Sequence, residues 1–383
     1  MLSYWEKNIF SANYDCVVVG AGFVGTHAAI QLLKARPKMK VLLVEQSVLG
    51  AAASTKNAGF ACLGSPSELL ENIDLRGIDA VVKLFEWKWK GINKLLGEVG
   101  KQKIAFQAVK GYDLFSSITA QDYDSSCERL DILNDLAKSV TGIYPFYEPL
   151  QGDLTKLFGF SNFFAKAIQI NYEGQLNPAA ALRFLHLKAQ NLGAQILCGV
   201  GASPNIVASG DGLQMLELTN GLRINTKQVL VCVNGFAAPF LGENSVVPGR
   251  GQVVVRSLGA NLLRFKGNFH YEGGYTYFRN IGSNKLLIGG GRNHALQTEN
   301  TTEFGSSAVI QTHLNALIGH ILPDQKTQEE ANWSGIMGFT PSGLPVIKTM
   351  KPGLHCAVGL NGMGVAMGAY VGAQAAKLVQ NCQ

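Results

Sequence analysis

The feature that most constrains the fold is an apolar segment near the start of the chain that ends in a glycine-rich turn. The segment 14–19 (YDCVVV) leads into the pattern G-x-G-x-x-G over 20–25, and an amphipathic stretch, 26–35, follows. A second apolar run, 41–44, ends at Glu45. Strand, glycine turn, helix, strand and acidic residue in this order predict the βαβ unit that binds dinucleotides.

Each residue type in this unit has a physical role. Gly20 allows the tight turn out of the strand, Gly22 lets a pyrophosphate approach the backbone, and Gly25 lets the helix pack against the strand. The N–H groups of the helix N-terminus attract phosphates. Glu45 is placed to bind a ribose diol and would repel a 2′-phosphate, so NADP is disfavoured, while FAD and NAD stay open. The residues expected at the dinucleotide are Gly20, Ala21, Gly22, Phe23, Val24, Gly25, Glu45 and Gln46.

Composition narrows the class of protein. The 383 residues are 47% hydrophobic and 16% charged, which suits a well-buried globular chain of two domains or one divided domain. The net charge of +6 is mild and is spread along the chain, so no nucleic-acid groove is expected. No apolar stretch has membrane-spanning length, and residues 1–14 lack the apolar core of a secretion signal. Seven cysteines without a C-x-x-C pair predict reduced thiols in a cytoplasmic protein.

Later segments predict two kinds of sheet. The all-apolar runs 229–233 and 355–358 are typical of parallel strands that are covered on both faces. The segments 251–258, 273–280 and 285–290 alternate and favour an antiparallel sheet with one face toward a cavity. Helical periodicity predicts helices over 67–99, 121–140, 178–191 and 365–379.

Five separated segments together resemble the FAD-dependent oxidoreductases of the D-amino-acid oxidase and glycine oxidase family, with a closer likeness to its amine-oxidising members. They are 17–25 with Glu45, 53–59 (ASTKNAG), 231–235 (VCVNG), 333–346 (WSGIMGFTPSGLPV) and 359–365 (GLNGMGV). The resemblance extends over nearly the whole chain. It implies that the dinucleotide is FAD.

The family resemblance also implies an architecture. We expect an α/β protein with a Rossmann-like FAD-binding domain built on a parallel sheet. A second, α+β domain with a large mixed or antiparallel sheet would bind the substrate. The FAD-binding domain would be discontinuous, over 1–95, 155–240 and 328–383, and the substrate domain would cover 96–154 and 241–327.

The resemblance assigns further residues to the flavin. Ser54 and Thr55 would donate hydroxyl hydrogen bonds to the pyrophosphate, and 57–59 would run beside the isoalloxazine. Backbone N–H groups of 362–364, at a helix N-terminus, would face the N1–C2=O edge, where negative charge develops when the flavin accepts a hydride. The full additional set is Ser54, Thr55, Asn57, Ala58, Gly59, Asn234, Gly235, Gly335, Asn361, Gly362, Met363, Gly364 and Val365.

The fourth segment departs from the family pattern at the substrate end. Amino-acid-oxidising members usually have G-[LI]-R-P-x-T-P-D, whose arginine binds the substrate carboxylate. This chain has Met337 in place of the arginine and Ser342 in place of the aspartate, which resembles amine-oxidising relatives such as γ-glutamylputrescine oxidase. The cysteine that holds flavin covalently in sarcosine-oxidase relatives is missing from 333–339, so non-covalent FAD is expected.

Other cations are candidates for the missing arginine's role. Arg279 shares a strand face with Tyr275 and Tyr277, Arg292 closes the next strand, and Lys56 lies near the expected flavin. The shared face would either line the cavity or pack structurally, and the choice between Arg279 and Arg292 is open. His270 and His294 flank these strands, and the spacing of the seven histidines predicts no metal site. The residues assigned to the substrate pocket are Tyr277, Arg279, Lys56 and Met337.

The reaction implied by the family is oxidation of a C–N bond in a small amine or an amino or imino acid. Hydride would pass to flavin N5, and water would hydrolyse the imine. O₂, a quinone or a protein would reoxidise the flavin. Sarcosine-oxidase relatives use a lysine for the O₂ reaction, and Leu287 stands at that place here, with Lys285 two residues away. The alternatives are a flavin-binding sensor or partner subunit without amine turnover, and a tRNA-modifying oxidase, which the lack of a basic cluster disfavours.

Overall fold

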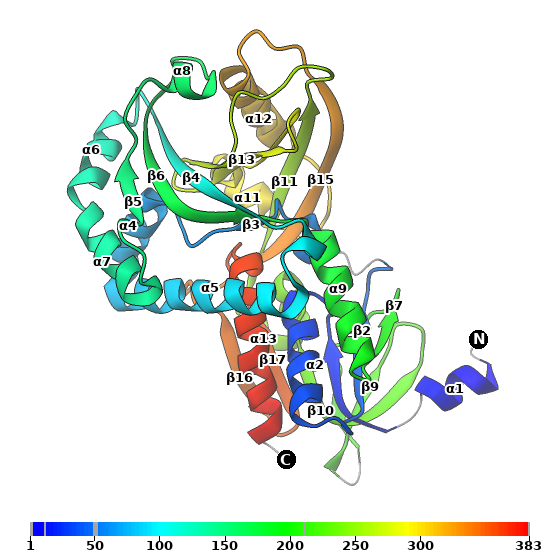
Figure 1. The fold of residues 1–383 in the computed structure, drawn as a ribbon. Coiled ribbons are helices and arrows are strands. Elements are labelled where there is room, and N and C mark those ends of the chain that lie inside the picture. The colour runs from blue at the N-terminus through cyan, green and yellow to red at the C-terminus, as the bar shows by residue number, and fades with distance from the viewer. Residues whose placement is uncertain (1–2, 11–12, 49–52, 210–211, 382–383) are drawn as a thin grey trace.

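The computed structural model describes residues 3–10, 13–48, 53–209 and 212–381 of the chain, which form two sheets with helices around them (Figure 1). The first sheet has the order β16-β17-β10-β1-β2-β7, with β9 on β10 and β8 on β9. Its strands are β1 (Tyr14–Val19), β2 (Val41–Glu45), β7 (Gln195–Cys198), β8 (Val207–Ala208), β9 (Gln214–Glu217), β10 (Arg223–Val231), β16 (Val346–Lys351) and β17 (Leu354–Val358).

The centre of the first sheet is parallel and almost wholly buried. β1 pairs in parallel with β2 and β10, and β10 pairs in parallel with β17. Such apolar strands need cover on both faces. On one face lie the neighbouring helices α2 (Phe23–Ala35) and α13 (Gly364–Asn381), with α9 (Pro178–Asn191) beside α2 (Figure 1). The helix α5 (Ile78–Val99) crosses α13 where the two halves of the molecule meet.

The second sheet is mixed and has the order β15-β11-β14-β13-β12-β4-β6-β3, with β5 on β6. All its pairs are antiparallel except β12 with β4. A buried group of aromatic rings packs on it under α12 (Ala308–Ile321), and Phe269 stacks on Phe278 with ring centroids 4.7 Å apart. The strands are β3 (Phe60–Ala61), β4 (Gln107–Ser116), β5 (Tyr147–Pro149), β6 (Phe164–Gln175), β11 (Val247–Ser257), β12 (Asn268–Tyr271), β13 (Thr276–Ile281), β14 (Lys285–Gly290) and β15 (Gln328–Phe339).

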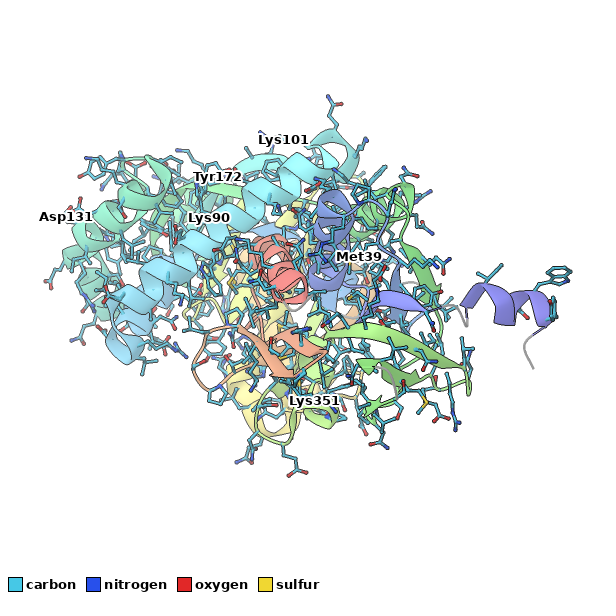
Figure 2. The ribbon with its side chains drawn as sticks, turned by 90° about the horizontal axis from the view of Figure 1, so that it is seen from below. Met39, Lys90, Lys101, Asp131, Tyr172 and Lys351 are labelled. Atoms are coloured by element: carbon cyan, nitrogen blue, oxygen red, sulfur yellow. The ribbon has the colours of Figure 1, made fainter. Side chains whose placement is uncertain are left out.

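The remaining helices are short or lie at the edges, and α1 stands apart from the body in both views (Figures 1 and 2). They are α1 (Tyr4–Phe10), α3 (Ala53–Lys56), α4 (Pro66–Arg76), α6 (Ala120–Glu128), α7 (Leu130–Thr141), α8 (Leu154–Phe158), α10 (Ala238–Leu241) and α11 (Leu296–Glu299), with the 3₁₀ turns η1 (Gln102–Ile104), η3 (Asn234–Phe236) and η4 (Arg292–Ala295). None of the described helices is both long and apolar enough to cross a membrane.

The expected fold class is confirmed, with corrections in detail. The helix expected over 67–99 is broken at Gly77, whose φ of +81° ends α4 before α5 begins. The helix expected over 121–140 is likewise two helices, α6 and α7. The boundaries expected at 155 and 328 would place β6 and β15 with the first sheet, but both belong to the second, because β6 pairs with β4 and β15 with β11.

An ion cluster around a nearly buried carboxylate fixes α5 to α2 and α9. Glu98 on α5 is 2.7 Å from Lys34 Nζ on α2 and 2.5 Å from Lys188 Nζ on α9, and 7% of its side chain is exposed. Burial raises the pKa of Glu98, but the hydrogen bonds and charges of the two lysines outweigh burial and bring the pKa to about 2.

We expect Glu98→Gln to destabilise the fold by about 1–2 kcal/mol at pH 7, a range that allows for solvent screening. Because the folded pKa lies below the ordinary value of 4.5, the stabilisation is complete above pH 4.5 and is lost as the pH falls toward 2. Urea unfolding of both proteins at several pH values measures this.

The matched control is Glu86→Gln on the same helix, which removes an exposed pair with Lys90, labelled in Figure 2. This change should cost less stability than Glu98→Gln at pH 7. Equal losses in the two variants, or a Glu98→Gln loss that does not shrink below pH 4.5, would contradict the role given to Glu98.

Candidate active site

A cavity of about 930 Å³ is lined by residues of both sheets. At one end lie the glycine turn after β1 and Glu45 at the end of β2. At the other end lie side chains from β13, β15 and the turn after β14. The cavity therefore connects the expected dinucleotide site with the expected substrate site.

Backbone crowding explains the glycines of the turn. A Cβ on Gly20, whose φ is +100°, would lie 2.6 Å from the Cys232 carbonyl oxygen, and one on Gly22 would lie 2.7 Å from Ser54 Oγ. Gly22 caps α2, whose first turn contains no acidic side chain. The turn thus places on the cavity wall a helix N-terminus whose first turn has no acidic residue, which favours an anionic group there.

Glu45 is held beside the glycine turn. Its Oε2 accepts a hydrogen bond from the Ala21 N–H at 3.0 Å, and Oε1 accepts from the Ser47 N–H and Oγ at 3.0 and 2.9 Å. These bonds orient the carboxylate in the cavity wall. It is placed as a ribose-binding residue would need to be.

The segment 53–59 forms another wall. Ser54 Oγ accepts from the Phe23 N–H at 3.0 Å, so this segment is fixed to the start of α2. The Asn57 side chain donates to the Ala53 and Ser54 carbonyls and accepts from the Gly59 N–H, each at 2.9 Å. The asparagine therefore shapes the loop beside the expected isoalloxazine with its own side chain.

A second helix N-terminus, that of α13, also lies on the cavity wall. Gly362 to Val365 line the cavity, and the first turn of α13 is free of acidic residues. Two left-handed asparagines support this turn. Asn234 Oδ1 accepts from the Gly359 and Leu360 N–H groups at 3.0 and 3.2 Å, and Asn361 Oδ1 accepts from the Thr340 N–H at 2.8 Å.

Four residues expected at the cofactor, Ala21, Gly25, Thr55 and Gly235, do not line the cavity. A Cβ on Gly25 would lie 2.0 Å from the Gly20 carbonyl oxygen, and one on Gly235 would lie 2.3 Å from the Met337 carbonyl oxygen. Ala21, which is part of the turn, is wholly buried. Thr55 Oγ1 is buried without a hydrogen-bond partner in the described part of the chain. The other expected cofactor residues line the cavity.

Three of the four expected substrate-pocket residues line the other end of the cavity. They are Lys56, Tyr277 and Met337. Lys56 Nζ lies 5.7 Å from the ring centroid of Phe304, and burial raises the pKa of Tyr277 to about 12. Met337 lies where the arginine of the amino-acid-oxidising members is expected, and its Cε is 2.9 Å from where a Gly251 Cβ would be.

The fourth, Arg279, does not line the cavity, and this corrects our expectation. The residue is 9% exposed, and its guanidinium donates to the Ala58 carbonyl at 2.7 Å and to the Leu176 carbonyl at 3.3 Å. Burial lowers its pKa to about 10. Arg279 shares the strand face of Tyr277 as expected, but it lies beneath the 57–59 segment and supports the segment's backbone.

The structure also places the lysine and the leucine that bear on the O₂ reaction. Leu287 is buried in a small apolar cluster with Val253 and Val255 and does not line the cavity. Lys285 pairs with Glu330 Oε1 at 2.5 Å near the surface. Neither position puts a cation into the cavity.

Buried polar residues on the cavity wall were only partly foreseen. His270 lines the cavity, and its Nε2 is 2.8 Å from Oε1 of the buried Glu173. Burial lowers the pKa of His270, but the charge and hydrogen bond of Glu173 outweigh burial, so the pKa is raised. The pairing joins β12 to β6, and no sequence spacing indicates it. Cys62, Glu68 and Lys88 also line the cavity without having been expected there.

A cluster outside the cavity lining was missed as well. Glu272, His294 and His313 each bring one possible metal-ligand atom within 4.8 Å of the others. The two imidazole rings lie 4.1 Å apart, and His294 Nε2 is 3.0 Å from Glu272 Oε2. The three residues belong to different turns and helices, so their spacing in the sequence does not predict that they lie close together.

Comparison with known proteins identifies the family. The family model described as FAD dependent oxidoreductase, DAO, matches residues 15–378. The chain belongs to this family. The glycine turn, the two helix N-termini without acidic residues and Glu45 fit FAD, and the chain is an FAD-dependent oxidoreductase, as its motifs predict.

Individual relatives are distant. The chain is 22% identical over 375 residues to the probable oxidoreductase OrdL of Haemophilus influenzae, which covers 94% of this chain and 81% of that protein. It is similar in structure to glycine oxidase from Geobacillus kaustophilus, with a TM-score of 0.78, 22% identity and coverage of 97% and 95%. Iminodiacetate oxidase from Chelativorans sp. BNC1 gives a TM-score of 0.74 at 19% identity, with 96% of each chain covered.

We expect Gly22→Ala to weaken FAD binding about tenfold or more, because the added Cβ would fill the space beside Ser54 that the pyrophosphate needs. The apoprotein should lose only modest stability, because the Cβ displaces Ser54 Oγ and weakens its one hydrogen bond with the Phe23 N–H. Gly97→Ala on α5 is the matched control, because a Cβ there has no neighbour within 4 Å. Flavin titration by fluorescence quenching and thermal unfolding measure both effects. An unchanged FAD affinity in Gly22→Ala would contradict the role given to Gly22.

Proposed function

We propose that this protein oxidises a C–N bond of a small amine or of an amino or imino acid with non-covalent FAD. The observation that carries the proposal is the continuous cavity, which joins a dinucleotide cradle to a pocket with aromatic and cationic side chains. When bound, FAD supplies the hydride acceptor, N5, and the imine that forms is then hydrolysed by water. Glycine oxidase and iminodiacetate oxidase, two proteins of similar structure, act on such compounds by name, which supports the substrate class.

The residues of the pocket suit a small substrate. Phe60 and Tyr277, whose ring centroids are 5.4 Å apart, provide an apolar wall, and Met337 provides another. Apolar walls exclude water from the reacting carbon and favour the neutral form of an amine, whose lone pair assists hydride departure. No side chain is needed as a base in this scheme, so His270 and Tyr277 are proposed as wall residues.

The proposal also covers how the flavin is attached, which electron acceptor reoxidises it and where in the cell the protein acts. No cysteine occurs over 333–339, and burial raises the pKa of the Cys62 and Cys232 thiols that do line the cavity, so neither is activated as a nucleophile. We propose dissociable FAD on this basis. Both O₂ and a quinone or protein stay open as acceptors, and a cytoplasmic location stays a prediction from the sequence.

The test is anaerobic mixing of the purified yellow protein with a panel of primary amines, secondary amines, amino acids and imino acids. We expect the visible flavin absorbance to bleach with a subset of the panel and to return when air or a soluble quinone is admitted. Acid precipitation should leave the flavin in the supernatant. A protein that binds no FAD would refute the proposal. Bound FAD that no compound bleaches, together with a stable protein partner, would favour the sensor or partner-subunit alternative.

A further inference from the structure

Two histidines and one glutamate from three separate segments meet beside the substrate end of the cavity. Glu272 lies in the turn between β12 and β13, His294 lies in η4, and His313 lies on α12. Each offers one possible ligand atom, and these atoms lie within 4.8 Å of one another. Two imidazole nitrogens and a carboxylate oxygen are donors that divalent transition-metal cations such as Zn²⁺ prefer.

The separations between the ligand atoms match those around a four-coordinate cation. His294 Nε2 lies 3.0 Å from Glu272 Oε2, and His313 Nε2 lies 3.7 Å from the same oxygen. Ligands that surround Zn²⁺ tetrahedrally at about 2.0–2.1 Å are roughly 3.3 Å from one another. The two measured distances lie on either side of this value, so small rotations of the side chains would admit the cation.

Neighbouring residues hold the carboxylate and one imidazole in this arrangement. Asn293 Nδ2 and Thr276 Oγ1 lie 3.2 and 3.4 Å from Glu272 Oε2, and Thr276 Oγ1 is also 3.1 Å from His313 Nε2. Gly291 has a φ of +76°, and a Cβ there would lie 2.8 Å from His313 Cδ2. The glycine therefore lets the imidazole approach the turn. Such surrounding contacts are those that orient the ligands of a metal site.

The cluster is accessible to a cation from solvent. The exposed fractions of the side chains are 38% for His294, 22% for Glu272 and 16% for His313. Glu272 and Glu71 both line a second cavity of about 510 Å³, and Glu71 Oε2 is 3.4 Å from where a Gly273 Cβ would be. Two neighbouring carboxylates at this opening attract positive charge.

We propose that Glu272, His294 and His313 bind one divalent transition-metal cation. Each neutral imidazole gives the lone pair of its Nε2, the carboxylate gives Oε2 and its negative charge, and water completes the coordination. The spacing of the histidines in the sequence predicts no metal site, because the three ligands come from segments that only the fold brings together.

The cation joins two turns of the cavity wall to α12. Gly274 and Tyr275 from the turn after β12 line the substrate end of the cavity, and so does Arg292 at the start of η4. The three ligands themselves lie outside that lining. The cation therefore acts through the shape of the wall, and its binding is independent of the proposed function and can be tested without turnover.

The experiment titrates the FAD-bound protein, prepared without a histidine tag and freed of metal, with Zn²⁺. Isothermal titration calorimetry and competition with a chromophoric chelator measure the affinity. We expect one Zn²⁺ per chain. His294→Ala and Glu272→Gln should each weaken its binding about tenfold or more, because each removes one of three ligands. The matched control is His320→Ala, which removes another histidine of α12, stacked on Phe163, and should bind Zn²⁺ as the wild type does.

Hydrogen exchange gives a second readout that does not depend on activity. Zn²⁺ should slow amide exchange over 272–276 and 291–296 in the wild type and in His320→Ala, and should leave it unchanged in His294→Ala. The proposal is overturned if the wild type has no one-to-one Zn²⁺ site, or if His294→Ala and Glu272→Gln bind Zn²⁺ as tightly as His320→Ala does. If Glu272→Gln does not fold, His294→Ala, which changes a more exposed side chain, decides the question.

Discussion

The parallel pairing at the centre of the first sheet is the constraint on which the site depends. Val19, Val44, Val231 and Cys356 lie side by side at the carboxyl ends of their strands. The four segments that follow these residues therefore leave the sheet at one edge. That edge brings together the glycine turn, Glu45, Asn234 and the N-terminus of α13, although more than 340 residues separate the first from the last. These apolar strands are buried on both faces, by the helices α2 and α13 on one face and by residues such as Ile206 and Leu218 on the other.

The second sheet completes the site by binding the backbone of the segment 56–59. Arg279 on β13 binds the Ala58 carbonyl, and Trp333 on β15 donates its indole N–H to the Lys56 carbonyl at 2.9 Å. The segment 56–59 is thus fixed both to the start of α2, through Ser54, and to the mixed sheet. This arrangement explains why a cation as strongly buried as Arg279 is tolerated. Carbonyl oxygens, which carry partial negative charge, surround it in place of water.

Local features of the site could be predicted from the sequence, and long-range ones could not. The glycine turn, Glu45 and the 362–364 turn depend on neighbours within one strand, turn and helix, so a short motif specifies them. Strand alternation correctly placed Arg279 on the same face of β13 as Tyr277. It gives no information on which other segment, here 57–59, packs over that side chain. The His270–Glu173 pair and the placement of β6 depend on the register between distant strands. No short motif encodes that register.

Two glycines of β11, Gly249 and Gly251, shape the substrate end of the cavity. A Cβ on Gly249 would lie 2.5 Å from the Phe339 ring and 2.9 Å from Arg292 Nε, and one on Gly251 would lie 2.9 Å from Met337 Cε. The space that the two glycines of β11 leave free is therefore filled by side chains from β15 and from the turn after β14. The neighbouring acid Glu299 is bound by another arginine, Arg250. Packing at the substrate end of the cavity thus requires glycine at both positions of β11.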